Sequence, residues 1–451
     1  MAALPIPNDL NAQSLLVYLE QIVDGLLSRN VRVTSYSADG TEVERSLQRL
    51  MKAKGTSHII HTVKNPHPGS PDLEISIAVF KGGHPIVMQQ DPEHFLKTMR
   101  NNLFSGARLL TFGNATALYR RIRQVAFEEG SPLYHRDVEK LDRQDDNAAT
   151  RLASAGMQEY LIQHHPDYIL EIDFLFAVGE LSDALQNRHI SHSERIKLAL
   201  RTRYFLDMWE TYLDSCGYNR AKHYLSREAS DIARMLIEGL ISLIIVYRDH
   251  VPGKYPLLPW MHSTAPCEHC FGEFRFTIKD FTMLDVFYMQ PKVVVKLREA
   301  ILRGHSSDPK ARASGYCHTY FDMHGIDLAT LAVFPSDQEI QRIAIDAAQE
   351  ADSLVKLLGV NPEQLWRRRT ANPIPLLPSL NMWYHSDTDD GSSDDSESSE
   401  DGDDCNDAEE LQQLIDGEEN PVGARTPKQD QHLLALTYAS FAATADDLIK
   451  V

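Results

Sequence analysis

The sequence predicts an α/β segment, then a block built only of helices, and then an acidic tail. Three observations predict this order. Strand-like and helix-like patterns alternate up to residue 113, helical spacing of apolar residues continues alone over 114–262, and residues 387–410 are low in complexity and rich in Asp, Ser and Glu. Such a composition cannot bury enough apolar surface to fold. The 451 residues leave room for two or three domains.

The α/β segment is predicted from strands and helices that follow one another closely. Two of its strands run directly into an aspartate, Asp39 and Asp91, and a helix follows each aspartate. That arrangement is typical of a sheet with a site at the carboxyl ends of its strands. The predicted elements are a helix over 10–28, a strand over 31–37, a helix over 42–54, a strand over 58–63, a loop over 65–71, a strand over 85–88 and a helix over 94–103.

Helices are predicted throughout the block that follows, until four prolines between residues 252 and 266 end it. Further helices are expected over 267–276, 281–304 and 335–358, with a polar loop over 304–315. Prolines at 373, 375 and 378 begin a linker. The expected division of the chain is 1–113 for the α/β core, 114–262 for the helical block, 263–360 for a helical C-terminal part of the core, 361–430 for the linker and acidic segment, and 431–451 for a last helix.

The net charge of −19 comes almost entirely from one segment. The chain has 45 Lys and Arg against 64 Asp and Glu, and 16 of these acids lie between Ser386 and Asn420, where there is no Lys or Arg. The rest of the chain carries 48 acids against 45 bases, so its charge does not exclude DNA as a partner. The acidic segment itself is suited to binding basic proteins.

The cysteines and the apolar runs indicate an intracellular protein, nuclear or cytoplasmic. Five cysteines are an odd number for a disulfide framework, and no signal-peptide pattern opens the sequence. The most apolar run, Leu236–Tyr247, is too short to span a membrane, so no membrane partner is expected. The basic run Leu365–Arg369 is more typical of a helix end than of an import signal.

Three places hold residues that could carry chemistry. Asp39 ends a predicted strand, and Asp91 is followed on one predicted helix by His94 and Lys97, which share a helix face. The third place is the run Cys267–Arg275 (CEHCFGEFR). Each also has a structural explanation. A strand-terminal Asp is most often a turn former or helix cap, a helix can simply present a polar face, and a free Cys behaves as a small hydrophobe.

Taken together, these places resemble P-element-type DNA transposases. Residues 91–103 (DPEHFLKTMRNNL) resemble the family's Asp-x-x-His-x-x-Lys-x-x-Arg-Asn stretch, and Asp39 is placed like the acid on the fourth strand of its RNase H-like core. CEHCFGEFR resembles the family's Glu-x-x-Phe-Gly-x-x-Arg segment and a related segment of hAT transposases, in which the Glu completes an Asp-Asp-Glu metal site. Residues 135–152 are similar to a stretch that follows the core, and the resemblance spans about residues 30–300.

The resemblance implies an RNase H-like core, with residues 114–262 as a helical insertion, and metal-dependent cleavage and transfer of DNA strands. Two Mg²⁺ or Mn²⁺ ions would stabilise the attacking and leaving oxygens, and such hard cations take oxygen ligands. Asp39 and Glu268 would be the catalytic and metal-binding residues, and Asp91 and His94 would be weaker candidates near the site. The residues that would contact DNA are Lys97, Arg100, Asn101 and Arg275.

The sequence departs from this family at its start. The family's first Asp lies on the first strand of the sheet, followed by a hairpin of two more strands, and only Ala2–Pro7 precede the first predicted helix here. We therefore expect an N-terminally incomplete sheet. The chain would be a transposase-derived protein, either incomplete or domesticated, that lacks one metal-binding carboxylate and, with it, most activity.

Two alternatives stay open at this point. A non-enzymatic protein associated with chromatin could use the helical block and the acidic tail as docking surfaces, and a homo-oligomer is compatible with the sequence. Zinc is not expected, because a site built from Cys267, Cys270, Cys317 and His318 would include two adjacent ligands, which rarely complete a tetrahedron.

Overall fold

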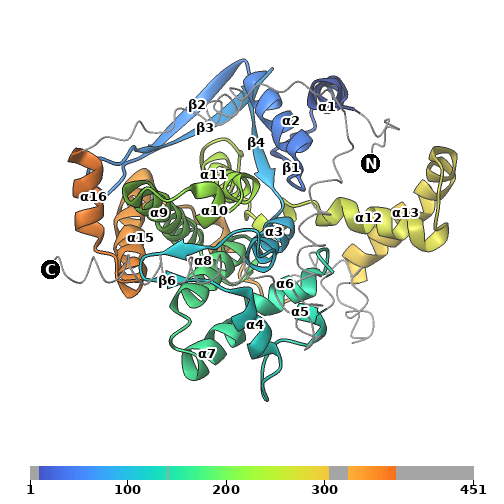
Figure 1. The fold of residues 1–451 in the computed structure, drawn as a ribbon. Coiled ribbons are helices and arrows are strands. Elements are labelled where there is room, and N and C mark those ends of the chain that lie inside the picture. Colours follow the sequence, from blue (N-terminus) through green and yellow to red (C-terminus); the bar gives the residue numbers. More distant parts are fainter. Residues whose placement is uncertain (1–9, 140–141, 304–323, 372–451) are drawn as a thin grey trace, which may run out of the picture.

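The computed structural model describes residues 10–139, 142–303 and 324–371, which form a mixed α/β fold in which helices predominate (Figure 1). Its main sheet has four strands in the order β1-β4-β3-β2. The strand β4 pairs in parallel with β1 and antiparallel with β3, which in turn pairs antiparallel with β2. These strands are β1 (Ser35–Ala38), β2 (Ser57–Val63), β3 (Leu73–Phe80) and β4 (His84–Gln90).

The strand β3 adds to the elements that the sequence predicted. Its buried residues Leu73, Ile75 and Ile77 alternate with less buried ones, and the turn Gly82-Gly83, with both φ angles positive, returns the chain into β4. The result is an antiparallel meander of β2, β3 and β4, in which β4 lies in the middle of the sheet beside β1.

Helices cover both faces of the sheet. The helices α1 (Ala12–Leu27) and α2 (Glu42–Ala53) cover one face, where Leu16, Leu47 and Met51 pack against Ile86 and other residues of β3 and β4. The opposite face packs on the helical block, chiefly on α11 (Arg227–Asp249). The sheet is therefore the middle layer of an α/β/α arrangement.

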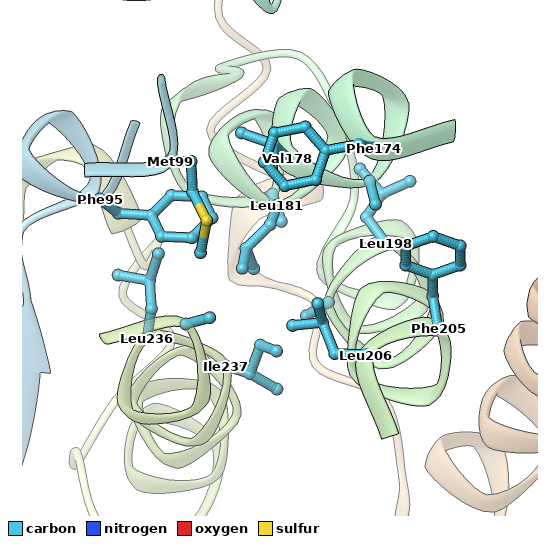
Figure 2. Close-up of a cluster of buried hydrophobic side chains, with 14 of the residues drawn as sticks. Phe95, Met99, Phe174, Val178, Leu181, Leu198, Phe205, Leu206, Leu236 and Ile237 are labelled. Atoms are coloured by element: carbon cyan, nitrogen blue, oxygen red, sulfur yellow. The ribbon is translucent and has the colours of Figure 1, made fainter. Parts of the chain in front are cut away.

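The largest core lies inside the helical block. The long helix α9 (His192–Cys216) packs against α8 (Ile169–Gln186), α11 and α15 (Asp337–Leu357), and α3 (Pro92–Phe104) joins them from the sheet edge. Figure 2 shows the side chains of α3, α8, α9 and α11 meeting in this core. The apolar run that is too short for a membrane span forms the second half of α11, which is buried around most of its circumference.

Shorter elements complete the described fold. They are β5 (Thr111–Phe112), β6 (Ala115–Thr116), α4 (Tyr119–Ala126), α5 (Arg136–Glu139), α6 (Asp146–Leu152), α7 (Ala155–His164), α10 (Arg220–His223), the 3₁₀ turns Pro259–Met261 and Thr330–Ala332, α12 (Ala265–Thr277), α13 (Met283–Arg303) and α16 (Pro362–Ala371).

Most predicted helices and strands up to residue 371 are confirmed within a few residues at each end. The basic run Leu365–Arg369 lies within the helix α16, as expected. No helix among the described residues is both long and apolar enough to cross a membrane. The acidic segment, the last predicted helix over 432–449, Cys317, His318 and Cys405 lie outside the described residues.

A glycine allows α11 to approach the sheet closely. A Cβ atom at Gly239 would lie 2.1 Å from Oε1 of Gln89 and 3.0 Å from the carbonyl oxygen of Met88. Gln89 is fully buried, so its side chain has no solvent-filled space into which to move.

We expect Gly239→Ala to lower the free energy of unfolding by about 2 kcal/mol, because the added methyl group would push α11 away from β4. Urea denaturation followed by circular dichroism measures this change. Gly156→Ala on α7 is the matched control, since its Cβ would meet only Ser154 Oγ, at 3.9 Å. That control should be neutral or slightly stabilising, as is usual for glycine in a helix. Equal effects of the two substitutions would show that the contact between α11 and β4 is not tight.

Candidate acidic site at the carboxyl edge of the sheet

Two of the predicted site residues follow adjacent parallel strands. Ala38 at the end of β1 is paired in register with Gln90 at the end of β4, so Asp39 and Asp91 are the next residue of each strand. The backbone N–H of Asp91 donates to the carbonyl of Ala38 at 2.9 Å. The sheet itself therefore brings these two aspartates to one edge.

Gly40 allows Asp39 to lie against the first turn of α3. Its φ of +95° is in the region that favours glycine. A Cβ there would lie 3.1 Å from Cδ2 of His94 and 2.9 Å from Oε1 of Gln90. The buried guanidinium of Arg45 donates to the Gly40 carbonyl and holds this turn in place.

Asp91 caps α3 and also connects it with the segment that leads into α12. Its Oδ2 accepts from the backbone N–H of His94 at 2.9 Å, and its Oδ1 accepts from the backbone N–H of Thr264 at 3.1 Å. The hydroxyl of Thr264 donates in turn to Oε1 of Glu268 at 3.0 Å. Thr264 thus bonds to both carboxylates, and Glu268 lies on the first turn of α12 at the same edge as Asp91.

The electrostatics connect Asp91 with Glu268, and Asp39 with Glu44. Burial raises the pKa of Asp91, against the effect of its two amide donors, and the negative charge of Glu268 raises it further. Burial would also raise the pKa of Asp39, but a hydrogen bond with Glu44 and the positive charges of His94 and Lys97 lower it below its usual value. Burial, together with that hydrogen bond and the charge of Asp39, raises the pKa of Glu44 to about 8. Asp39 and Glu44 therefore share one proton at neutral pH.

Lys97 supplies positive charge to the same edge. Its Nζ lies 2.9 Å from a carboxylate oxygen of Asp146, at the start of α6, and its side chain is 16% exposed. Burial lowers the pKa of Lys97, but the hydrogen bond and charge of Asp146 outweigh this and raise it. Burial and then the charge of Asp91 raise the pKa of Glu93 to about 7.

A half-buried histidine anchors the segment that carries Thr264. Nδ1 of His262 lies 2.7 Å from the Ser35 hydroxyl at the start of β1, and its Nε2 lies 3.4 Å from the hydroxyl of Tyr247. Burial lowers the pKa of His262 to about 4, so the ring is neutral at physiological pH. The anchor joins the segment before α12 to the sheet and so fixes the position of Glu268 relative to the strand ends.

The other predicted DNA-contacting residues lie apart from this cluster. Arg100 is 3% exposed, and its guanidinium donates to the carbonyls of Asp142 and Asp145, so it holds a loop instead of facing solvent. Asn101 is half-buried beside it. Arg275 is exposed near the end of α12.

Sequence reasoning missed Glu44, Glu93, Asp146 and Thr264. Glu93 lies within the quoted DPEH run, so a count of acids along that run could have found it. Glu44 occupies the third position of a helix capped by Thr41, where a Glu is common for capping alone. Its nearness to Asp39 becomes evident only in the fold.

The donor types at this edge fit Mg²⁺ or Mn²⁺, since both ions take carboxylate oxygens. In the part of the chain that the structure describes, however, no three His, Cys, Asp or Glu residues are grouped so that they could hold a metal ion. Asp91 uses both carboxylate oxygens to accept backbone amides, and Asp39 is bonded to Glu44. Cys267 and Cys270 are free thiols whose pKa values burial raises.

Comparison of the chain with models of protein families, with curated proteins and with solved structures finds no match.

Proposed function

We propose that the chain derives from an RNase H-like DNA transposase and that its acidic edge acts on DNA strands with the help of a divalent metal ion. The observation that carries the proposal is that Asp39 and Asp91 follow two adjacent parallel strands and that Thr264 links Asp91 with Glu268 at the same edge. All three belong to the segments that resemble that family.

Asp91 adds a third carboxylate to the two that the sequence assigned to the site. The resemblance alone left two carboxylates for a site that needs three, and therefore predicted an incomplete centre. Asp91 follows the strand β4, which lies between the parallel strand β1 and the antiparallel hairpin partner β3. In the family the first acid lies on a strand that a hairpin follows, whereas here the hairpin precedes Asp91 in the chain.

Among the described residues these acids are not grouped closely enough to hold a metal ion, so Asp39, Asp91 and Glu268 would have to come together around it. A bound ion would stabilise charge on the attacking and leaving oxygens of a phosphodiester. The chain's own residues supply the surroundings. The negative charges of Glu268 and Asp91 help to raise the pKa of Lys97. The positively charged Lys97 can neutralise a DNA phosphate beside these carboxylates. Glu268 is exposed and held by one hydroxyl, so it can turn toward the two aspartates when a cation enters.

The test is a nicking assay on supercoiled plasmid with Mg²⁺ or Mn²⁺, combined with Mn²⁺ binding measured by electron paramagnetic resonance. We expect metal-dependent nicking that falls at least about 100-fold in Asp39→Asn, Asp91→Asn and Glu268→Gln, since each removes a charged ligand from a centre with few ligands. Mn²⁺ affinity should fall in the same variants.

The control is Asp167→Asn, which removes an exposed carboxylate outside the acidic edge. Nicking that survives in all three site variants, or no metal-dependent nicking in the parent chain, would overturn the proposed activity. The alternative, a non-enzymatic interaction protein, predicts that the parent chain shows no metal-dependent nicking and that the three site variants bind partners as the parent does.

A further inference from the structure

The helices α12 and α13 form a hairpin that extends away from the rest of the described fold (Figure 1). They pack against each other around their own small core, formed by Phe274 of α12 and by Val286, Met289 and Val293 of α13. Because α12 begins at the acidic edge, the hairpin is an arm attached directly to the candidate site.

The helix α13 has a second apolar stripe on the side that faces away from α12. Leu284, Tyr288, Pro291 and Val295 follow one another at spacings of four, three and four residues, which is the spacing of a coiled-coil seam. Leu284 is 63% exposed, Tyr288 74% and Val295 58%. A helix that is apolar on both sides is normally buried on both sides.

The outward side of α13 exposes several large apolar side chains. Phe287 is 62% exposed and Tyr288 74%. At roughly 200 Å² for a whole aromatic residue, these two alone expose roughly 270 Å². Leu284, Val294 and Val295 add to this area. Exposed apolar patches of several hundred Å² commonly mark interaction sites, roughly from 300 Å² upward.

We propose that this face binds a second copy of the same chain, with α13 packed antiparallel on α13 of the other copy. In an antiparallel pair with this seam, Leu284 of one copy meets Val295 of the other, and Tyr288 meets Pro291. The helix α12 of each copy then stays on the outer side of its own α13. A two-fold axis relates the copies, so each contact occurs twice.

The residues beside the seam make the pairing self-complementary. Asp285 and Lys292 flank it on one side, and the antiparallel arrangement places Asp285 of one copy beside Lys292 of the other. Phe287 and Val294 flank it on the opposite side and meet in the same reciprocal way, and both are exposed in the single chain. In a parallel arrangement Lys292 would instead face Phe287 of the other copy, so this ion pair could not form.

Sedimentation velocity of the full chain over a range of concentrations tests the proposal. We expect the parent chain to form a dimer, and Leu284→Glu and Val295→Glu to raise the dimer dissociation constant at least about 100-fold. Ile162→Glu on α7 is the matched control, because this residue is 57% exposed but lies outside the arm. It should leave the dimer unchanged.

A charge exchange separates this pairing from unspecific association of apolar surfaces. Asp285→Lys and Lys292→Asp should each weaken the dimer about ten-fold, and the double variant should restore it, because the exchange recreates both ion pairs. The proposal would be overturned if the parent chain stays monomeric at concentrations up to about 100 μM, where even weak transient contacts begin to form. Failure of the double variant to restore the dimer would overturn the antiparallel pairing. Neither outcome depends on the proposed activity.

Discussion

Replacing Asp231 with alanine is expected to lower the free energy of unfolding by about 3 kcal/mol. Asp231 lies on α11 with a side chain only 3% exposed, and its Oδ2 is 2.7 Å from Nη2 of Arg49 and 4.0 Å from Nε of the equally buried Arg45. The substitution removes the buried countercharge of both guanidinium groups. The expected loss is at the lower end for a broken buried pair, because Arg45 keeps its contacts with Glu42 and Glu228.

The same substitution should affect the acidic edge. Arg45 donates to the Gly40 carbonyl, so a displaced guanidinium releases the turn that carries Asp39. Urea denaturation at pH 7 gives the stability change, and Mn²⁺ binding by the folded variant reports on the turn. The matched control is Glu228→Ala, which removes a carboxylate from the same Arg45 but from a half-exposed position, and it should cost less than about 1 kcal/mol. A loss for Asp231→Ala no larger than for this control would show that the ion pair does not connect α2 with α11.

The helices could be predicted from the sequence because their apolar spacing and their caps agree. Thr41, Asp91 and Ser336 each accept a hydrogen bond from the third residue of the helix that follows, and the sequence marks each of these starts. The pairing of the strands could not be predicted in this way. The alternating residues of β3 are visible in the sequence, but nothing local indicates that β4 joins β1 in parallel and so becomes an inner strand.

The same limit applies to the candidate site. Helical spacing correctly grouped His94 with Lys97, and both lie close enough to Asp39 to lower its pKa. It could not reveal that Arg100, three residues further on, is buried against the carbonyls of another loop. Nor could it reveal that Asp91 is as close to the site as Asp39, because that follows from strand pairing between residues more than fifty positions apart.

A buried acid outside the acidic edge gives a large expected dependence of stability on pH. Asp173 lies on α8 and is 2% exposed, and its Oδ2 has no hydrogen-bond partner among the described atoms. Burial raises its pKa from 3.8 to about 7. The folded state therefore holds the proton more tightly than the unfolded state does, so this group costs nothing below about pH 4 and destabilises the fold increasingly as pH rises to about 7.

Asp173→Asn should remove this dependence, because an amide of nearly the same shape does not ionise. We expect the variant to gain stability over the parent chain as pH rises, by about 2–3 kcal/mol more at pH 8 than at pH 5, since one pKa unit corresponds to about 1.4 kcal/mol. Urea denaturation at the two pH values gives the difference, with Asp167→Asn, an exposed carboxylate near the start of the same helix, as control. The control should show no such gain. A parallel pH profile for Asp173→Asn and the parent chain would mean that Asp173 is charged in the folded protein and has found a partner, which would require α8 to open toward solvent.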